Sequence, residues 1–127
     1  MARILVVDDD DLLARLIEQT LVQAGHEVVW AMNGTEAVRL YSPARFDLVV
    51  TDLIMPEKEG LELITELKKV DAGVRIIAMS GGGRNGPSGY LPIAKHMGAK
   101  AVLRKPFSIV ELIKTVESVL LDSGSPR

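Results

Sequence analysis

The sequence contains no cysteine, carries little net charge and opens with only a short apolar run. The absence of cysteine excludes disulfide bonds and thiolate metal sites, and it is compatible with a reducing compartment. The apolar run, Ile4 to Val7, ends in four consecutive aspartates and is too short for a signal-peptide core or a membrane span. The expected location is therefore the cytoplasm.

The charge balance gives no indication of a nucleic-acid or membrane partner. The chain has 15 basic and 17 acidic residues, so its formal net charge is -2 and gives no sign of a nucleic-acid surface or a polybasic membrane patch. Its 127 residues, 47% hydrophobic and 25% charged, are typical of one globular domain. We expect that domain to cover residues 1–121, with residues 122–127, rich in serine, glycine and proline, as a flexible tail.

Short apolar segments alternate with amphipathic segments along the chain. Strands are expected at residues 4–7, 28–31, 48–50, 74–79 and 101–103. Helices are expected at residues 13–24, 36–41, 60–70 and 109–120, and a further short helix ends near Gly98. Because parallel strands need crossover connections, this alternation predicts a parallel sheet covered on both faces. The fold class is a doubly wound α/β domain, whose functional site lies at the carboxyl ends of the strands.

Two helices carry clear start signals. Asn33 is a suitable N-cap for the second helix. Ser108 and Glu111 form an S-x-x-E capping box before the last helix, and Phe107 can pack against Leu112 as a hydrophobic staple.

Reactive side chains follow four of the five expected strands. Asp8 to Asp11 follow the first strand, Asp52 the third, Ser80 the fourth and Lys105 the fifth. Each one alone is ordinary loop polarity, because loops favour Asp and Ser for turn formation. Together they place a carboxylate cluster, a hydroxyl and an ammonium at one edge of the sheet.

This group of side chains indicates phosphoryl chemistry supported by a divalent metal. Carboxylates held close together repel one another and need a cation, and oxygen ligands of this kind suit Mg²⁺. A carboxylate can also attack a phosphoryl group, a transfer that needs cations to offset the charge on the phosphoryl oxygens. Lys105 and a metal ion would supply those charges, and Ser80 could hydrogen-bond the third oxygen.

Four motifs, in the right order, resemble the receiver domain of two-component response regulators. They are Ile4-Leu5-Val6-Val7-Asp8-Asp9, Asp52-Leu53-Ile54-Met55-Pro56 with Gly60, Ser80 after the fourth strand, and Lys105-Pro106-Phe107. The resemblance covers about residues 3–121. It implies a flavodoxin-like (βα)5 fold with strand order 2-1-3-4-5, in a receiver of the stand-alone, single-domain type.

The resemblance also implies roles for individual acidic residues. Asp52 matches the phosphoacceptor, Asp9 the direct metal ligand, and Asp8 the second acidic residue, which usually reaches the metal through water. Ile54 would give its backbone carbonyl to the metal. The implied cofactor is Mg²⁺.

The remaining matched positions bind the phosphoryl group. Ser80 matches the Thr/Ser that moves to bind it, and Lys105 matches the lysine that pairs with it, usually followed by a cis peptide to the proline, here Pro106. Asp10 and Asp11 have no family role, and one of them is expected to cap the first helix.

Two features depart from the family pattern. The switch aromatic of the family is replaced by Val102, which cannot swing a ring, so we interpret it as strand packing while its effect on signalling stays open. The segment from Ser80 to Lys105 is longer than usual, and Gly81, Gly82 and Gly83 give it backbone freedom. We expect residues 87–90 to form a turn and the short helix to start at about residue 91 or 92, because a proline inside a helix removes a hydrogen bond.

The leading hypothesis is a phosphorylated signalling switch rather than a turnover enzyme. Its donor would be a histidine kinase or a histidine phosphotransfer protein, its output an unknown protein target, and it would bind neither nucleic acid nor membrane. An aspartyl-phosphate phosphatase is disfavoured, because Ile54 occupies the position of the second aspartate of those enzymes. A nucleotide-binding loop is disfavoured because the G-x-x-x-x-G-K-[ST] motif is absent. A receiver-like binding module that needs no phosphorylation remains an alternative.

Overall fold

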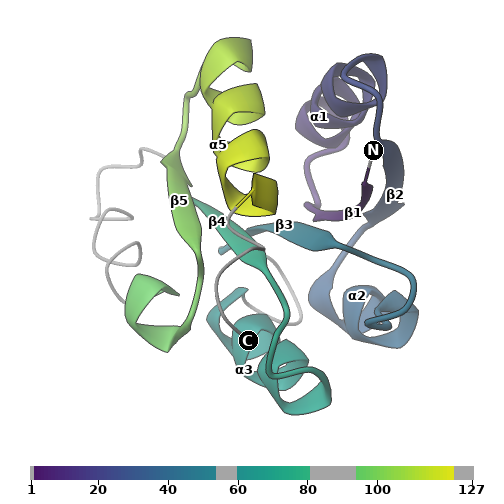
Figure 1. Ribbon diagram of the computed structural model, residues 1–127, viewed down its shortest axis with the longest axis vertical. Coiled ribbons are helices and arrows are strands. Elements are labelled where there is room, and N and C mark those ends of the chain that lie inside the picture. Colours follow the sequence, from purple (N-terminus) through teal and green to yellow (C-terminus); the bar gives the residue numbers. More distant parts are fainter. Residues whose placement is uncertain (1, 54–59, 81–93, 122–127) are drawn as a thin grey trace.

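The structure is a computed structural model that describes residues 2–53, 60–80 and 94–121. In it, strands alternate with helices along the chain (Figure 1). The strands are β1 (Arg3–Val7), β2 (Glu27–Ala31), β3 (Leu48–Asp52), β4 (Ile76–Ser80) and β5 (Ala101–Arg104). The helices are α1 (Asp11–Gln23), α2 (Gly34–Leu40), α3 (Gly60–Val70) and α5 (Ile109–Leu121).

The strands form one parallel sheet in the order β2-β1-β3-β4-β5. In Figure 1, α1 and α5 lie on one face of this sheet, and α2 and α3 lie on the other. The doubly wound architecture and the strand order are confirmed. All strands run in the same direction, so their carboxyl ends meet at one edge, which is the edge that carries the candidate site.

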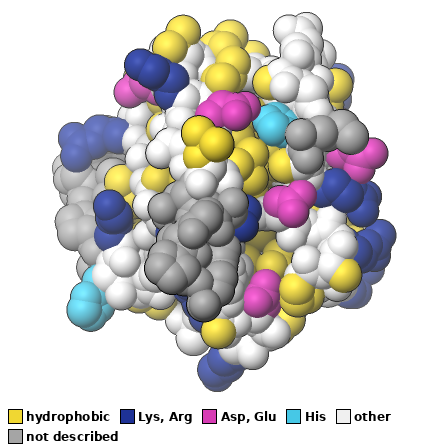
Figure 2. All heavy atoms as spheres, in the orientation of Figure 1, with side chains coloured by type: hydrophobic (Ala, Val, Ile, Leu, Met, Phe, Trp, Pro, Cys, Tyr) yellow, Lys and Arg dark blue, Asp and Glu magenta, His cyan; other side chains and the backbone are white. Residues whose placement is uncertain are grey.

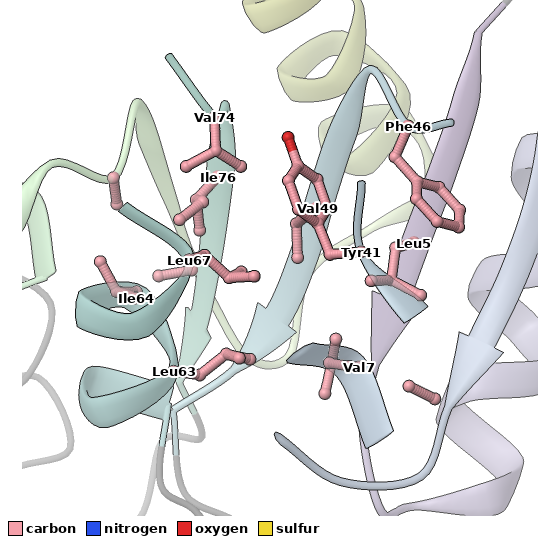
Figure 3. Packing of buried hydrophobic residues seen from close by; sticks show 14 of the residues in the cluster. Leu5, Val7, Tyr41, Phe46, Val49, Leu63, Ile64, Leu67, Val74 and Ile76 are labelled. Carbon is pink, nitrogen blue, oxygen red and sulfur yellow. The ribbon is translucent and has the colours of Figure 1, made fainter. Parts of the chain in front are cut away.

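Side-chain alternation along the strands divides the core into two clusters, one on each face of the sheet. In β1, Leu5 and Val7 belong to the cluster that includes residues of α2 and α3, whereas Ile4 and Val6 belong to the cluster that includes residues of α1 and α5. Figure 3 shows the first cluster, where Leu63, Ile64 and Leu67 of α3 point toward the sheet. Because both faces are covered, the central strands are buried at nearly every position.

Two strands continue further than their apolar patterns indicate. Asp52 is the last residue of β3 and Ser80 the last residue of β4, although the apolar runs end at Val50 and Met79. The reason is that the ladder continues past the apolar residues, pairing Asp52 with Met79 and Ser80 with Arg104. The sheet therefore fixes the backbone at both residues, and both residues are buried.

The expected helix caps are present. The Asp10 side chain accepts hydrogen bonds from the backbone N–H groups of Leu12 and Leu13, so Asp10 rather than Asp11 caps α1. Asn33 caps α2 by accepting a bond from the Glu36 N–H at 2.9 Å. After α1, Gly25 has a φ of 99°, a conformation that favours glycine.

The capping box before α5 is also confirmed. The Ser108 hydroxyl accepts a bond from the Glu111 N–H, and the Glu111 carboxylate accepts one from the Ser108 N–H, both at 3.0 Å. Phe107 packs against the same cluster as the buried Leu112. These contacts fix the chain between the end of β5 and the start of α5, which is the segment that carries Lys105.

Several predicted segments lie outside the described residues. They are the glycine-rich loop, the turn at residues 87–90, the helix start at residue 91 or 92, and the tail at residues 122–127. Within the described part, residues 94–97 are helical and Gly98 has a φ of 118°.

One face of the molecule has a mixed charge pattern. On the face shown in Figure 2, acidic and basic side chains are interspersed rather than gathered into areas of one sign. Among the described residues, none of the helices has both the length and the apolar character needed to cross a membrane. The cytoplasmic location stays a prediction.

Candidate functional site

Three carboxylates converge at the carboxyl edge of the sheet. Asp8 directly follows β1, Asp9 is next along the chain, and Asp52 ends the neighbouring strand β3. One ligand oxygen from each lies within 4.8 Å of the others. Asp8 and Asp52 are buried, whereas Asp9 is exposed to solvent. The cluster is thus open on one side and enclosed by protein on the other.

Lys105 directly follows β5, on the far side of β4, and brings a positive charge into this cluster. Its Nζ lies 3.1 Å from Asp52 Oδ2 and 3.4 Å from Asp8 Oδ2. The backbone helps to hold it, because the Lys105 N–H donates to the Ser80 carbonyl at 2.7 Å. The peptide bond from Lys105 to Pro106 is cis, as the resemblance implied.

The pKa of Asp8 shows that the negative charge of this carboxyl is destabilised in the cluster. Burial raises the pKa of Asp8 from its ordinary value of 3.8 to about 6. The Asp10 N–H, which donates to Asp8 Oδ1 at 2.9 Å, and the Lys105 ammonium lower this pKa, while the charge of Asp52 raises it. A further cation beside Asp8 would favour its ionised form.

The residues present fit a small divalent cation. They offer three carboxylates, an oxygen donor set of the kind that Mg²⁺ prefers, and the exposed Asp9 leaves a side on which the ion could keep its waters. The backbone carbonyl of Ile54, expected as another ligand, lies outside the described residues. The acidic cluster could therefore hold a metal ion.

Ser80 lies at the same edge, as the last residue of β4, which lies between β3 and β5. It is fully buried. The structure thus brings together the predicted residues Asp8, Asp9, Asp52, Ser80 and Lys105.

Val102 lies in β5 and is half-buried against the cluster on the α2 and α3 side of the sheet. The interpretation of Val102 as strand packing agrees with this position.

One contact at the site was not expected from the sequence. The indole Nε1–H of Trp30, in β2, donates to the backbone carbonyl of Asp8 at 2.8 Å. A signal was available, because Trp30 stands near the carboxyl end of a strand expected beside the first. The position of Trp30 alone does not identify the Asp8 carbonyl as its hydrogen-bond partner, because the register of the two strands must be known first.

Comparison with known proteins agrees with this geometry. The model of the response regulator receiver domain family matches residues 4–117. The chain belongs to this family. It is a response regulator receiver domain of two-component systems, a class of signalling switch.

Individual relatives resemble this receiver domain over almost its whole length. The chemotaxis protein CheY of Bacillus subtilis is 37% identical over 119 residues, which cover 93% of this chain and 97% of that protein. The solved structure of a response regulator receiver domain protein from Clostridium thermocellum has a TM-score of 0.90 and 29% identity, covering 97% of both chains.

Another relative is much longer than this receiver domain. The DNA-binding transcriptional regulator NtrC of Azospirillum brasilense is 37% identical over 125 residues, covering 98% of this chain. The receiver domain spans only 25% of the length of that regulator. The similarity therefore concerns one quarter of that regulator.

Proposed function

We propose that this receiver domain, over residues 1–121, accepts a phosphoryl group on Asp52 and changes its protein contacts as a result. The observation that carries the proposal is the Lys105 Nζ at 3.1 Å from Asp52 Oδ2, beside three carboxylates whose ligand atoms lie within 4.8 Å of one another. This arrangement combines a carboxylate nucleophile with a fixed positive charge. The donor would be a histidine kinase or a histidine phosphotransfer protein.

In the proposed transfer, a carboxylate oxygen of Asp52 forms a bond to phosphorus while the bond from phosphorus to the donor nitrogen breaks. The electron pair of the breaking bond leaves with the imidazole of the donor. Negative charge stays on the three phosphoryl oxygens, and the Lys105 ammonium offsets part of it because it already lies against Asp52. Ser80, at the end of the adjacent strand, would donate a hydrogen bond to one of these oxygens.

Asp8, Asp9 and Asp52 would hold Mg²⁺, with the carbonyl of Ile54 as a further ligand. When bound, the ion neutralises charge on the phosphoryl oxygens and so lowers the barrier to transfer. Asp9 would bind directly from its exposed position, and the buried Asp8 would act through water. The raised pKa of Asp8, about 6, supports this role, because a nearby cation relieves the cost of its buried charge.

A groove beside the site would receive the donor protein. It has a volume of about 460 Å³, and Lys105 is one of its lining residues. It is lined by Asp10, Leu13, Leu16, Lys105, Pro106 and Phe107. Leu12 and Leu16 on α1 are exposed, with 79% and 47% of their surface in solvent, so an apolar partner surface would cover them.

A direct test is Mg²⁺-dependent labelling by acetyl phosphate, followed by intact-mass measurement. The wild-type protein should gain one phosphoryl group, the Asp52→Asn variant should gain none, and EDTA should prevent the gain. Asp11→Asn is a matched control, because Asp11 is an exposed neighbour outside the carboxylate cluster. Labelling of Asp52→Asn at the wild-type level would refute the assignment.

The alternative, a binding module that needs no phosphorylation, is favoured by Val102 alone. A valine at the switch position has no ring to move between exposed and buried states. If the alternative holds, acetyl phosphate will not label the protein, and beryllofluoride will leave the binding of its protein partner unchanged.

A further inference from the structure

Trp30 links the edge strand of the sheet to the backbone of the carboxylate cluster. It is the only tryptophan in the chain, it is half-buried, and its indole N–H donates to the Asp8 carbonyl at 2.8 Å. Asp8 is fully buried. A carbonyl in such a place needs a hydrogen-bond donor, because water is not available to replace one.

The indole N–H donates to the first carbonyl beyond the end of the ladder between β1 and β2. The last ladder pair is Val7 with Ala31, and the Asp8 N–H still donates to the Ala31 carbonyl at 3.2 Å. After Ala31 the chain turns into α2: the Met32 N–H donates to the Glu36 carboxylate, and Asn33 caps the helix. The strand therefore stops before it can pair with the Asp8 carbonyl, and the Trp30 side chain bonds that carbonyl in its place.

The orientation of Asp9 depends on this carbonyl. The Asp8 carbonyl and the Asp9 nitrogen belong to one planar peptide group, so a bond that holds the carbonyl also fixes the plane from which Asp9 continues. Asp9 is the exposed member of the cluster. Asp8 is fixed on its side-chain end as well, because its Oδ1 accepts the Asp10 N–H at 2.9 Å.

The indole itself is held in a defined place. In the register of the sheet Trp30 stands opposite Val6, which ties its backbone to β1. Its side chain forms one wall of an open groove of about 630 Å³, whose other walls come from α1. The α1 residues are Arg15, Glu18, Gln19, Val22 and Gln23. The ladder thus fixes the backbone of Trp30, and its indole faces α1 across the groove.

We propose that Trp30 is a positioning residue of the cation site, whose indole N–H holds the peptide between Asp8 and Asp9 so that their carboxylates meet Asp52. This inference rests on the proposed function, in which the three carboxylates bind Mg²⁺. In this proposal Trp30 acts through the Asp8–Asp9 peptide and contacts neither the ion nor the phosphoryl group. Its effect is therefore on Mg²⁺ affinity rather than on the rate once Mg²⁺ is saturating.

The first test compares Mg²⁺ binding by the wild-type protein and the Trp30→Phe variant in isothermal titration calorimetry. The phenyl ring keeps most of the apolar contact but has no N–H to donate. Loss of one hydrogen bond to a buried carbonyl predicts a dissociation constant raised by about 3- to 10-fold. The matched control is Val22→Ala, which alters another wall of the same groove without touching Asp8 and should bind Mg²⁺ as the wild type does.

A second readout separates positioning from general loss of structure. With acetyl phosphate as donor, Trp30→Phe should need more Mg²⁺ for half-maximal labelling of Asp52, yet reach about the wild-type rate at saturating Mg²⁺. A lower maximal rate with unchanged Mg²⁺ dependence would overturn the positioning role. Equal Mg²⁺ affinity in both proteins, with normal labelling of Asp52, would also overturn it while the proposed function stands.

The wild-type protein gives a test that needs no variant. A single tryptophan gives one indole N–H resonance in a ¹H–¹⁵N spectrum. This resonance should be slow to exchange with solvent, and it should shift on Mg²⁺ addition with the dissociation constant that calorimetry gives. An indole resonance unchanged by saturating Mg²⁺ would overturn the inference, even if Trp30→Phe fails to fold. Absence of any Mg²⁺ binding by the wild type would overturn both this inference and the proposed function.

Discussion

The Nζ of Lys105 lies 3.1 Å from Asp52 Oδ2, although 53 residues separate the two in the chain. The same ammonium lies 3.4 Å from Asp8 Oδ2. One cation therefore contacts two buried carboxylates, one at the end of β3 and one directly after β1. The ammonium offsets part of the repulsion between the two carboxylates. It also weakens their attraction for a second cation. Lys105 should thus both stabilise the metal-free protein and oppose Mg²⁺ binding.

Replacing Lys105 by methionine should separate these two effects. In EDTA, Lys105→Met should lower the free energy of unfolding by about 1–3 kcal/mol, because two buried carboxylates lose their charged partner. The same variant should bind Mg²⁺ more tightly, on the order of tenfold, because a competing positive charge is gone. Urea denaturation and calorimetry measure the two quantities.

Lys114→Met serves as the control for the loss of a lysine, because Lys114 is exposed on α5. It should change neither quantity appreciably. Weaker Mg²⁺ binding in Lys105→Met would contradict the view that the ammonium and the ion compete for the same carboxylates.

The buried carboxyl of Asp8 predicts how stability changes with pH in the absence of metal. The pKa of Asp8 is about 6 in the folded protein and 3.8 ordinarily, so the folded state holds this proton more tightly than the unfolded state. The contribution of the Asp8 proton to the free energy of unfolding is fully present below pH 3.8. It falls as the pH rises toward 6 and is lost above pH 6. Asp8→Asn removes this cost and should be more stable than wild type at pH 7 by about 2–3 kcal/mol.

Denaturation in EDTA at several pH values tests this expectation. The advantage of Asp8→Asn should shrink as the pH is lowered from 6 to 4. Asp9→Asn is the matched control, because Asp9 is exposed and its charge is already solvated. If Asp8→Asn keeps the same advantage at every pH, the buried charge of Asp8 is not its cause.

Local patterns were enough to predict most of the fold. The alternation of apolar and amphipathic segments predicted the parallel sheet, and short motifs predicted the caps at Asn33 and Ser108. For α1 the sequence left the cap open between Asp10 and Asp11, and the structure shows that it is Asp10. The site residues could be predicted for a related reason. In a parallel sheet, residues at the carboxyl ends of neighbouring strands must lie near one another wherever they stand in the sequence.

The missed features depend on register and on long-range contacts. The apolar pattern ended β3 at Val50, because hydrophobicity does not reveal that Asp52 continues the ladder. The bond from Trp30 to the Asp8 carbonyl needs the pairing of β1 with β2 to be known residue by residue. Neither the extension of β3 nor this hydrogen bond can be predicted from the composition or the hydrophobic periodicity of the sequence.

The capping box before α5 predicts a measurable loss of stability. Ser108→Ala removes the hydroxyl that accepts the Glu111 N–H at 3.0 Å and should lower the free energy of unfolding by about 1 kcal/mol. Ser118→Ala, at an exposed position inside the same helix, should be neutral or slightly stabilising, because alanine favours helix interiors. Thermal and urea denaturation measure both variants, and an equal loss in the two would show that the box contributes nothing.

His26 anchors the edge of the sheet opposite the site through two unequal hydrogen bonds. Its Nδ1 accepts the Ala2 N–H at 3.1 Å and therefore carries no proton, so its Nε2 donates to Glu117 on α5 at 3.3 Å. The His26 side chain is only 6% exposed, whereas that of Glu117 is 49% exposed. The bond to Ala2 is therefore the one that water cannot replace.

Two substitutions measure these bonds separately. His26→Phe leaves the buried Ala2 N–H without an acceptor and should lower the free energy of unfolding by about 1–3 kcal/mol. Glu117→Gln keeps an acceptor for Nε2 and changes only a half-exposed charge, so it should cost less than about 1 kcal/mol. Because both residues lie away from the carboxylate cluster, labelling of Asp52 by acetyl phosphate should be unaffected in either variant that remains folded. A larger loss in Glu117→Gln than in His26→Phe would mean that the contact with α5, rather than the bond to Ala2, fixes this end of the sheet.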